Sequence, residues 1–204
     1  MSEPYRLGRG DIPRAREVLK DAFRRDPVWI RLFAGQERRN ARLSAFFETP
    51  LRHCLCYGQV AATSENLEGV AAWVPGERAS MTLWRMLRSG ALGCGLRVGM
   101  SVTRKMAPAF LPIERDRREH MRGRAFIYLQ IIGVAPRHQG KGFGGRLLRA
   151  IIAESEQEGR PLYLETETEE NVRLYERFGF RVIRKLILPG LELPMWEMAR
   201  EPGA

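Results

Sequence analysis

Apolar and polar residues alternate along the chain with two periods, and each period predicts one kind of element. Apolar positions three and four residues apart predict helices in the first half, over residues 11–24, 28–33 and 40–54. Short runs with few charges predict strands, over residues 5–8, 57–63 and 67–74. The last two strands form a hairpin, and because they hold few charges, both of its faces should be covered.

The rest of the chain follows the same two periods. Residues 79–106 have a helical pattern that several glycines interrupt, so we expect two helices there rather than one. The remaining predicted elements are a helix over 113–121, a strand over 126–134, a helix opening at 146, a strand over 162–166, a helix over 172–178, and a hairpin of strands 181–188 and 193–199. This order predicts a mixed central sheet with helices on both faces.

Composition limits the class of protein. A chain of 204 residues is long enough for one domain with its own core. It has no uncharged apolar run of 18 residues, and residues 1–30 do not resemble a signal peptide, so we expect a cytoplasmic protein with no membrane partner. The cysteines are odd in number and too irregularly spaced for a zinc site, so we expect reduced thiols and no metal: Cys54, Cys56 and Cys94.

Positive charge is concentrated in one region of the chain. The net charge is +10, and residues 81–124 hold ten Lys or Arg against three acidic residues, which is most of the excess. One interpretation is a basic surface that binds an acidic partner or nucleic acid. The other is an arginine-rich face in contact with solvent, which we favour because no aromatic-interleaved nucleic-acid motif accompanies the charge.

Residues 134–148, VAPRHQGKGFGGRLL, are the most informative stretch, a predicted strand–loop–helix junction with four glycines in six residues. Such a junction points unpaired backbone N–H groups at one place, where a helix N-terminus favours an anion such as a diphosphate. A Walker loop is excluded because Lys141 is followed by Gly142 rather than by a serine or threonine. A dinucleotide loop fits formally between Gly140 and Gly145, with Glu165 at about the expected distance.

A third pattern in this stretch combines Gln139, Gly142 and Gly144, and a second motif follows it. Residues 162–180 read LYLETETEENVRLYERFGF, in which Asn171 is a suitable helix N-cap and Gly179 a suitable left-handed helix end.

Together the two motifs resemble those of the GNAT acyl-coenzyme A N-acyltransferases, over about residues 125–183. The residues of the second motif that stand in the family's register are Asn171, Tyr175, Gly179 and Phe180. The resemblance implies the GNAT fold, an α/β (α+β) fold in one domain over residues 1–204. Its mixed sheet of six to seven strands is splayed between the fourth and fifth strands, with helices on both faces.

The resemblance also implies acetyl-coenzyme A as co-substrate. Its pantetheine arm would lie in the splay along the predicted strand 126–134, and its diphosphate would lie on the glycine-rich loop. The residues expected to contact it are Ile132, Gly133, Val134, Gln139, Gly140, Lys141, Gly142, Phe143, Gly144, Gly145, Asn171 and Tyr175.

Acetyl transfer to an amine must handle an amine proton, an oxyanion and a leaving thiolate. By resemblance, a backbone N–H near Val134 polarises the thioester carbonyl. We expect Tyr175 to be the general acid, because an ordinary pKa of about 10 keeps its hydroxyl protonated. Glu165 is the expected base, directly or through water. Less favoured bases are Gln130, Glu119 and His120.

The acceptor pocket is expected from residues 26–34, the helical elaboration 79–124 and the terminal hairpin. Five aromatic residues could form its walls: Trp29, Phe33, Trp73, Trp84 and Trp196. The predicted acceptor is a small-molecule primary amine, neutral or weakly basic, because a basic protein repels polyamines. The alternatives are a protein or peptide amine as acceptor, and a non-catalytic acyl-coenzyme A-binding regulator. We expect a monomer or homodimer and no nucleic-acid partner.

Overall fold

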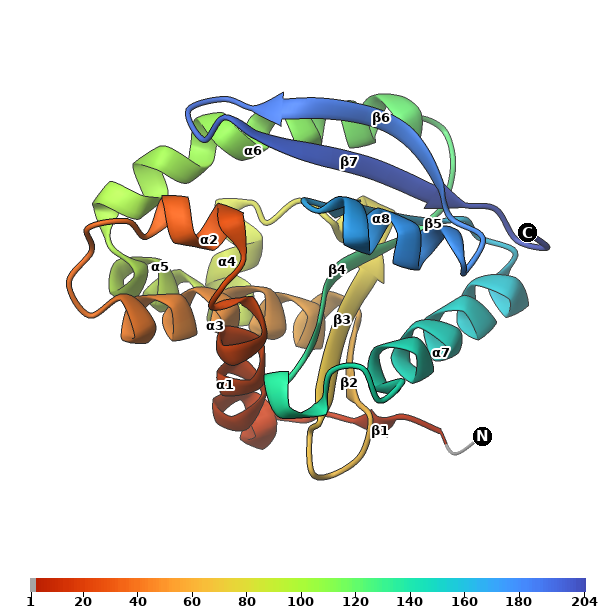
Figure 1. Ribbon diagram of the computed structural model, residues 1–204, viewed down its shortest axis with the longest axis horizontal. Helices are drawn as coiled ribbons and strands as arrows, with labels where there is room; N and C mark the ends of the chain where they lie inside the picture. Colours follow the sequence, from red (N-terminus) through yellow and green to blue (C-terminus); the bar gives the residue numbers. More distant parts are fainter. Residues whose placement is uncertain (1–2) are drawn as a thin grey trace.

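Seven strands form one sheet through the centre of the computed structural model, which describes residues 3–204 (Figure 1). The strands are β1 Tyr5–Arg6, β2 Gln59–Ala62, β3 Gly69–Pro75, β4 Ile127–Val134, β5 Leu162–Thr166, β6 Arg181–Leu188 and β7 Leu193–Arg200. They lie in the order β1-β2-β3-β4-β5-β7-β6. All neighbours are antiparallel except β4 and β5, which are parallel. The predicted mixed sheet is confirmed.

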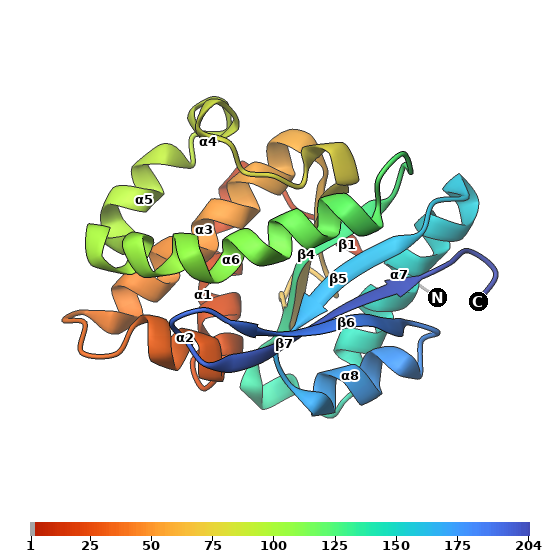
Figure 2. The ribbon, with the colours of Figure 1, turned by 90° about the horizontal axis from the view of Figure 1, so that it is seen from above.

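Helices cover both faces of the sheet. They are α1 Ile12–Phe23, α2 Pro27–Leu32, α3 Arg39–Tyr57, α4 Leu83–Ser89, α5 Leu92–Val98, α6 Met100–His120, α7 Phe143–Glu158 and α8 Glu169–Glu176. Figures 1 and 2 show α1, α3 and α6 on one face and α7 and α8 on the other. The chain therefore has two hydrophobic cores, one on each side of the sheet.

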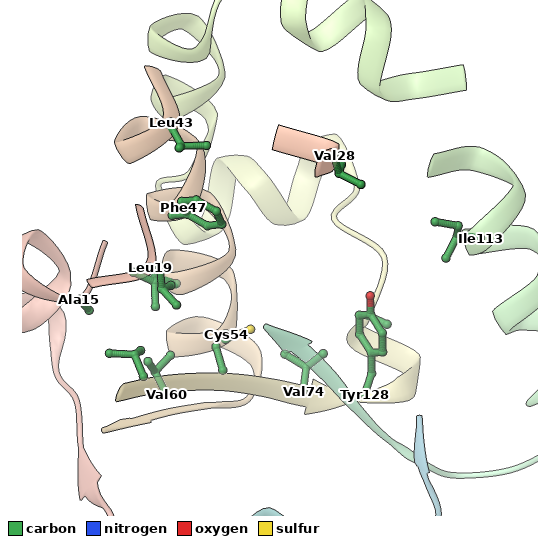
Figure 3. Packing of buried hydrophobic residues seen from close by; sticks show 14 of the residues in the cluster. Ala15, Leu19, Val28, Leu43, Phe47, Cys54, Val60, Val74, Ile113 and Tyr128 are labelled. Carbon is green, nitrogen blue, oxygen red and sulfur yellow. The ribbon is translucent and has the colours of Figure 1, made fainter. Parts of the chain in front are cut away.

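The hairpin of β2 and β3 separates the two cores. Val70, Ala72 and Val74 pack with α1 and α3, whereas the alternate residues Ala71 and Trp73 pack with α7. Successive side chains of a strand point to opposite faces, so a strand buried on both sides needs apolar residues at every position. Figure 3 shows the first of these cores, with the side chains of the helices meeting those of the strands. The expectation that both faces are covered is confirmed.

The pairing of β4 with β5 covers only the start of each strand. Ile127 pairs with Leu162 and Tyr128 with Tyr163, and the strands then separate. On its other side β4 pairs with β3 along its whole length, but Leu129 lies opposite Trp73 and Ile131 opposite Ala72.

This register leaves Gln130 as an extra residue, a β-bulge. A bulge bends its strand and increases the local twist. Because it lies where the two strands part, it accounts for the splay, which agrees with the predicted GNAT fold.

The region between β3 and β4 differs from the prediction. It holds three helices, as many as predicted, but their bounds differ. Both predicted pieces of 79–106 end before residue 100, and α6 starts there and runs without interruption through Pro108 and Pro112. Its buried residues Val102, Ala109 and Ile113 pack on the core along its whole length. This packing outweighs the local cost of the prolines.

Two glycines at positive φ set the breaks between these helices. Gly90 ends α4 at φ 73° and Gly99 separates α5 from α6 at φ 98°. Gly93 and Gly95 lie inside α5 and do not interrupt it.

Candidate active site

A cavity of about 460 Å³ lies against the part of β4 that β5 does not cover. Its walls come from β4, from the end of β5, from α8, and from α2, α3 and α6. All three segments expected to form the acceptor pocket contribute, through Trp29 from 26–34, Phe110 from 79–124, and Met195 from the terminal hairpin. The cavity thus extends from the splay of the sheet to a chamber under the N-terminal helices.

Tyr175 lines the cavity from α8. Its side chain is largely buried and meets Phe180 edge to face, with ring centroids 5.6 Å apart. Burial raises the pKa of Tyr175 above its ordinary value, and the charge of Glu167 raises it further. The phenol is therefore protonated at neutral pH, as a proton donor must be.

Asn171 lines the same cavity one turn before Tyr175, but it does not cap its helix. The N-cap is Thr168, whose hydroxyl oxygen accepts from the Asn171 main-chain N–H at 3.2 Å. The prediction that Asn171 caps the helix is therefore wrong. Thr168 takes that place because Glu169 and Glu170 can then lie in the first turn, where the helix dipole favours acidic residues. Asn171 is left inside the helix, one turn from Tyr175.

Glu165 is also in the cavity wall, where both of its carboxylate oxygens have partners. Oε1 lies 2.9 Å from Nη1 of Arg117, and Oε2 accepts from the Tyr128 hydroxyl at 2.7 Å. The Arg117 guanidinium lies over the Tyr128 ring, 4.1 Å from its centroid. In Figure 3 the Tyr128 side chain extends from the sheet toward the helices that carry Val28 and Ile113. Glu165 is therefore held in a buried ion pair, with both of its oxygens occupied by groups of the chain.

Glu167 is the carboxyl group that the sequence interpretation missed. It lines the cavity at the end of β5, close enough to Tyr175 to raise its pKa, and it is hydrogen-bonded to the carboxyl of Asp26. Burial raises the pKa of Glu167 well above its ordinary value, and the hydrogen bond and charge of Asp26 raise it further.

Asp26 is itself held in place, because its Oδ1 accepts from the main-chain N–H groups of Val28 and Trp29 and so caps α2. One signal for Glu167 was available in the sequence. Residues two apart on a strand face the same side, so Glu167 follows Glu165 toward the cavity.

The glycine-rich loop continues from the end of β4. The main-chain amides of residues 140–145 make no hydrogen bond to a main-chain carbonyl within residues 3–204, and the first helical bond of α7 runs from Arg146 to Gly142. Gly140 and Gly142 have φ values of 74° and 80°, and a Cβ at either position would meet nothing within 4 Å. The loop therefore offers a row of free donors at the positive end of a 16-residue helix. This arrangement fits a diphosphate.

The other residues predicted to contact acetyl-coenzyme A occupy different places around this loop. Gln139 Nε2 donates to the main-chain carbonyl of Val134 at 3.0 Å, which ties the loop to the end of β4. Lys141 is exposed, and Phe143 is the first residue of α7, so this helix starts earlier than predicted.

Three further residues of this predicted set lie in closely packed surroundings. A Cβ on Gly133 would come within 3.0–3.1 Å of α1 side chains. Gly144 lies against Val134 and Gly145 against Phe178. Ile132 lines the cavity.

Of the five aromatic residues considered for the acceptor walls, Trp29 lines the cavity. Phe33 is fully buried in the core, and Trp84 is 68% exposed. Trp73 donates from Nε1 to Glu154 at 3.0 Å under α7, and Trp196 lies beneath Lys185. The other aromatic rings of the cavity wall come from Phe23, Phe46, Phe110, Tyr128 and Tyr175.

Of the three less favoured candidate bases, one lies in the cavity wall and two lie outside it. Gln130 lines the cavity, and its Oε1 is buried without a hydrogen-bond partner in residues 3–204. His120 lies outside the lining residues, with Nδ1 3.4 Å from Glu197, and Glu119 is exposed.

Two negative findings concern the part of the chain that the structure describes. No group of three or more His, Cys, Asp or Glu there is placed to hold a metal ion, and Cys54, Cys56 and Cys94 are free thiols. No helix within residues 3–204 combines the length and apolar character needed to cross a membrane.

Comparisons with known proteins find acetyltransferases among the proteins that this chain is similar to. Residues 109–182 match the family model of the "Acetyltransferase (GNAT) domain". The chain is 29% identical over 200 residues to an uncharacterized N-acetyltransferase of Schizosaccharomyces pombe, covering 94% of this chain and 80% of that protein.

Two solved structures have the same fold. A protein of Corynebacterium glutamicum, described as a histone acetyltransferase and related acetyltransferase, superposes with a TM-score of 0.67 at 24% identity, over 100% of this chain and 98% of that one. A protein assigned as arylalkylamine N-acetyltransferase 7 of the mosquito Aedes aegypti superposes with a TM-score of 0.64 at 12% identity, over 96% and 85%.

Proposed function

Because this chain carries a GNAT acetyltransferase domain on the corresponding fold, we propose that it transfers an acetyl group from acetyl-coenzyme A to the primary amine of a small molecule. The observation that carries this proposal is one cavity that joins the uncovered edge of β4 to Tyr175 and to Glu167, which has Asp26 as its neighbour. A proton donor and a proton acceptor then lie beside the place where a thioester would be held.

Main-chain groups of this protein fit two parts of the co-substrate, its diphosphate and its pantetheine arm. The free amides of residues 140–145 would bind the diphosphate, and the main-chain groups of Leu129–Val134 on the β5 side would hold the pantetheine arm. When bound, acetyl-coenzyme A supplies the activated acetyl group. Fixing it at both ends positions the carbonyl for attack, which contributes much of the rate enhancement.

We assign the role of base to Glu167 together with Asp26. An amine reaches a neutral-pH enzyme largely as an ammonium ion, and it must lose a proton before its nitrogen can attack. The Glu167 carboxylate accepts that proton, and its raised pKa makes it a better acceptor than an ordinary glutamate. Glu165 is less suited, because Arg117 and Tyr128 already occupy its oxygens.

Tyr175 completes the reaction as general acid. The nitrogen–carbon bond forms while the carbon–sulfur bond breaks, and the Tyr175 hydroxyl donates its proton to the departing thiolate. After the attack the nitrogen is positively charged and loses its second proton, which restores the tyrosinate. The proton held by Glu167 leaves to solvent. Each group ends in its starting state, so the cycle is balanced.

The basic region does not favour nucleic-acid binding as a second function. Several of its arginines are paired within the chain: Arg97 with Glu48, Arg117 with Glu165, Arg118 with Glu114, and Arg124 with Glu201. Paired guanidinium groups contribute little to a phosphate-binding surface.

The direct test is calorimetry followed by turnover. Acetyl-coenzyme A should bind with micromolar affinity, and a panel of primary amines should then give free thiol. The panel includes puromycin, because the LETE…NVRLYERFGF stretch and the end of the chain resemble puromycin N-acetyltransferase. Absence of binding at millimolar acetyl-coenzyme A would refute the proposal. Binding without turnover across the amine and peptide panel would favour a regulator.

A further inference from the structure

The chamber at the α2–α6 end of the cavity is built mainly from apolar side chains. Its walls include Trp29, Phe46, Phe110, Met81, Met106 and Met195. Trp29 and Phe110 lie nearly parallel with ring centroids 6.4 Å apart, and Trp29 meets Phe46 at 4.4 Å. Aromatic rings and methionines make favourable contacts with flat or branched apolar groups and offer no partner to a hydroxyl-rich body.

The charges around the cavity leave room for one cation only. Arg117 and Glu165 neutralise each other, and Glu114 is paired with Arg118. Among residues 3–204, Glu167 is the carboxyl group of the cavity wall that has no ion pair with a Lys, Arg or His, so one carboxyl group is available to an ammonium ion. A second ammonium group in this chamber would be buried without a partner, which is strongly unfavourable.

One polar atom in the wall lacks a partner. Gln130 Oε1 is buried beside the bulge of β4 and accepts no hydrogen bond from residues 3–204. Buried carbonyl oxygens are nearly always paired, so an N–H or O–H donor of a bound molecule would complete this site.

From these three observations we infer that the acceptor is a monoamine with an apolar, preferably aromatic, body, whose ammonium group meets the Glu167 carboxyl group while its body fills the chamber lined by Trp29 and Phe110. This inference rests on the proposed function for turnover, but binding of the amine tests it separately. Polyamines and hydroxyl-rich amines are excluded by the same features: polyamines by charge, and hydroxyl-rich amines because Gln130 Oε1 can pair with one hydroxyl only and the walls are mainly apolar.

The first experiment compares three probes with the wild-type protein. The value of kcat/KM for 2-phenylethylamine should exceed the values for spermidine and for ethanolamine by about 100-fold, because only this probe buries a ring. Equal values, or a preference for spermidine or ethanolamine, would overturn the inference. Failure of the proposed function gives a different result, namely no thiol release with any of the three amines.

In that case binding decides the question. Titration of each amine into the protein, with and without coenzyme A, should still show 2-phenylethylamine binding and the other two not binding. If 2-phenylethylamine does not bind either, the inference is wrong regardless of turnover.

A matched pair of variants locates the binding site. Trp29→Ala should lower kcat/KM, or the affinity, for 2-phenylethylamine by about 10- to 100-fold and leave acetyl-coenzyme A affinity unchanged. Trp84→Ala removes an exposed indole that lies outside the cavity and should change neither value. If Trp29→Ala proves unstable, Met195→Ala in the same wall replaces it. An unchanged preference in a folded variant of either wall residue would contradict the assignment of the chamber.

Discussion

At the scale of single residues, the cavity prepares a carboxyl group and a phenol for opposite tasks. Burial and the neighbouring Asp26 raise the pKa of Glu167 well above its ordinary value. Burial and Glu167 raise the pKa of Tyr175, so its hydroxyl keeps its proton. In the proposed mechanism, Glu167 gains a proton and Tyr175 supplies one.

The first prediction is a shift in the pH profile. Glu167 must be ionised to act as base, so kcat/KM should fall as the pH falls through its raised pKa. Asp26→Asn removes the neighbouring charge, so the pKa of Glu167 should drop and the acidic limb should move to lower pH. Asparagine caps helices as well as aspartate does, so α2 is preserved. Asp21→Asn, on the exposed side of α1, should leave the pH profile unchanged. If wild type, Asp26→Asn and Asp21→Asn all have the same profile, Asp26 does not influence the catalytic carboxyl group.

The second prediction concerns the general acid. Tyr175→Phe removes only the hydroxyl and should lower kcat by about 100-fold or more. The affinity for acetyl-coenzyme A, measured by calorimetry, should stay the same. Tyr5→Phe in β1 provides a matched control with normal turnover. Undiminished turnover by the Tyr175 variant would exclude the phenol as proton donor.

At the scale of elements, one carboxylate ties three helices together. Glu48 of α3 is 4% exposed and pairs with Arg52 at 2.7 Å, with Arg97 of α5 at 2.9 Å, and with Arg16 of α1. Burial by itself would raise the pKa of Glu48, but the hydrogen bonds from these arginines outweigh it and lower that pKa to about 2.

The third prediction is that Glu48→Gln lowers the free energy of unfolding at pH 7 by about 2 kcal/mol. Because the folded pKa is depressed, the contribution is complete above the ordinary value of 4.5 and is lost as the pH falls toward about 2. The difference between wild type and variant in urea unfolding should therefore shrink from pH 6 to pH 3. Glu65→Gln, on an exposed turn, serves as control. A constant difference across this range would contradict the assigned role.

The fourth prediction tests the glycine-rich loop. Gly142 begins α7 at φ 80°, where a side chain costs about 1–2 kcal/mol. Gly142→Ala should therefore tilt the row of free amides and weaken acetyl-coenzyme A binding by about 10-fold. Gly95→Ala adds the same methyl group inside α5, at an ordinary φ with open space around it, and should bind normally. Equal affinities for the two variants would mean that the loop does not hold the co-substrate.

The sequence predicts those elements whose formation depends mainly on residues close together in the chain. The β2–β3 hairpin, the early helices, the glycine loop and the helix of Tyr175 follow from local patterns, and the structure contains them all. The continuity of α6 could not be read in this way, because its prolines are offset by packing against distant strands. The Asp26–Glu167 pair was missed for the same reason, since its two members come from opposite ends of the chain.

At the scale of the whole molecule, the sheet consists of two parts joined by the short β4–β5 pairing. We expect acetyl-coenzyme A to stabilise the fold by contacting both sides of the splay. At a ligand concentration of 100 times Kd the gain is about 2.7 kcal/mol. For a chain of this size, this should raise Tm by about 5–10 °C, measurable by scanning fluorimetry. Gly142→Ala should show a smaller rise at the same concentration; an equal rise would show that the loop is not involved.

The splay also means that this sheet has more than two edges. β1 and β6 end it on the outside, and the second half of β4 presents a further row of unpaired peptide groups within the molecule. Unpaired strand edges are where extended segments of other chains add, which is how many proteins aggregate. We therefore expect the donor-free protein to have an additional site of strand addition, and bound acetyl-coenzyme A to cover this edge and so reduce association between copies of the protein.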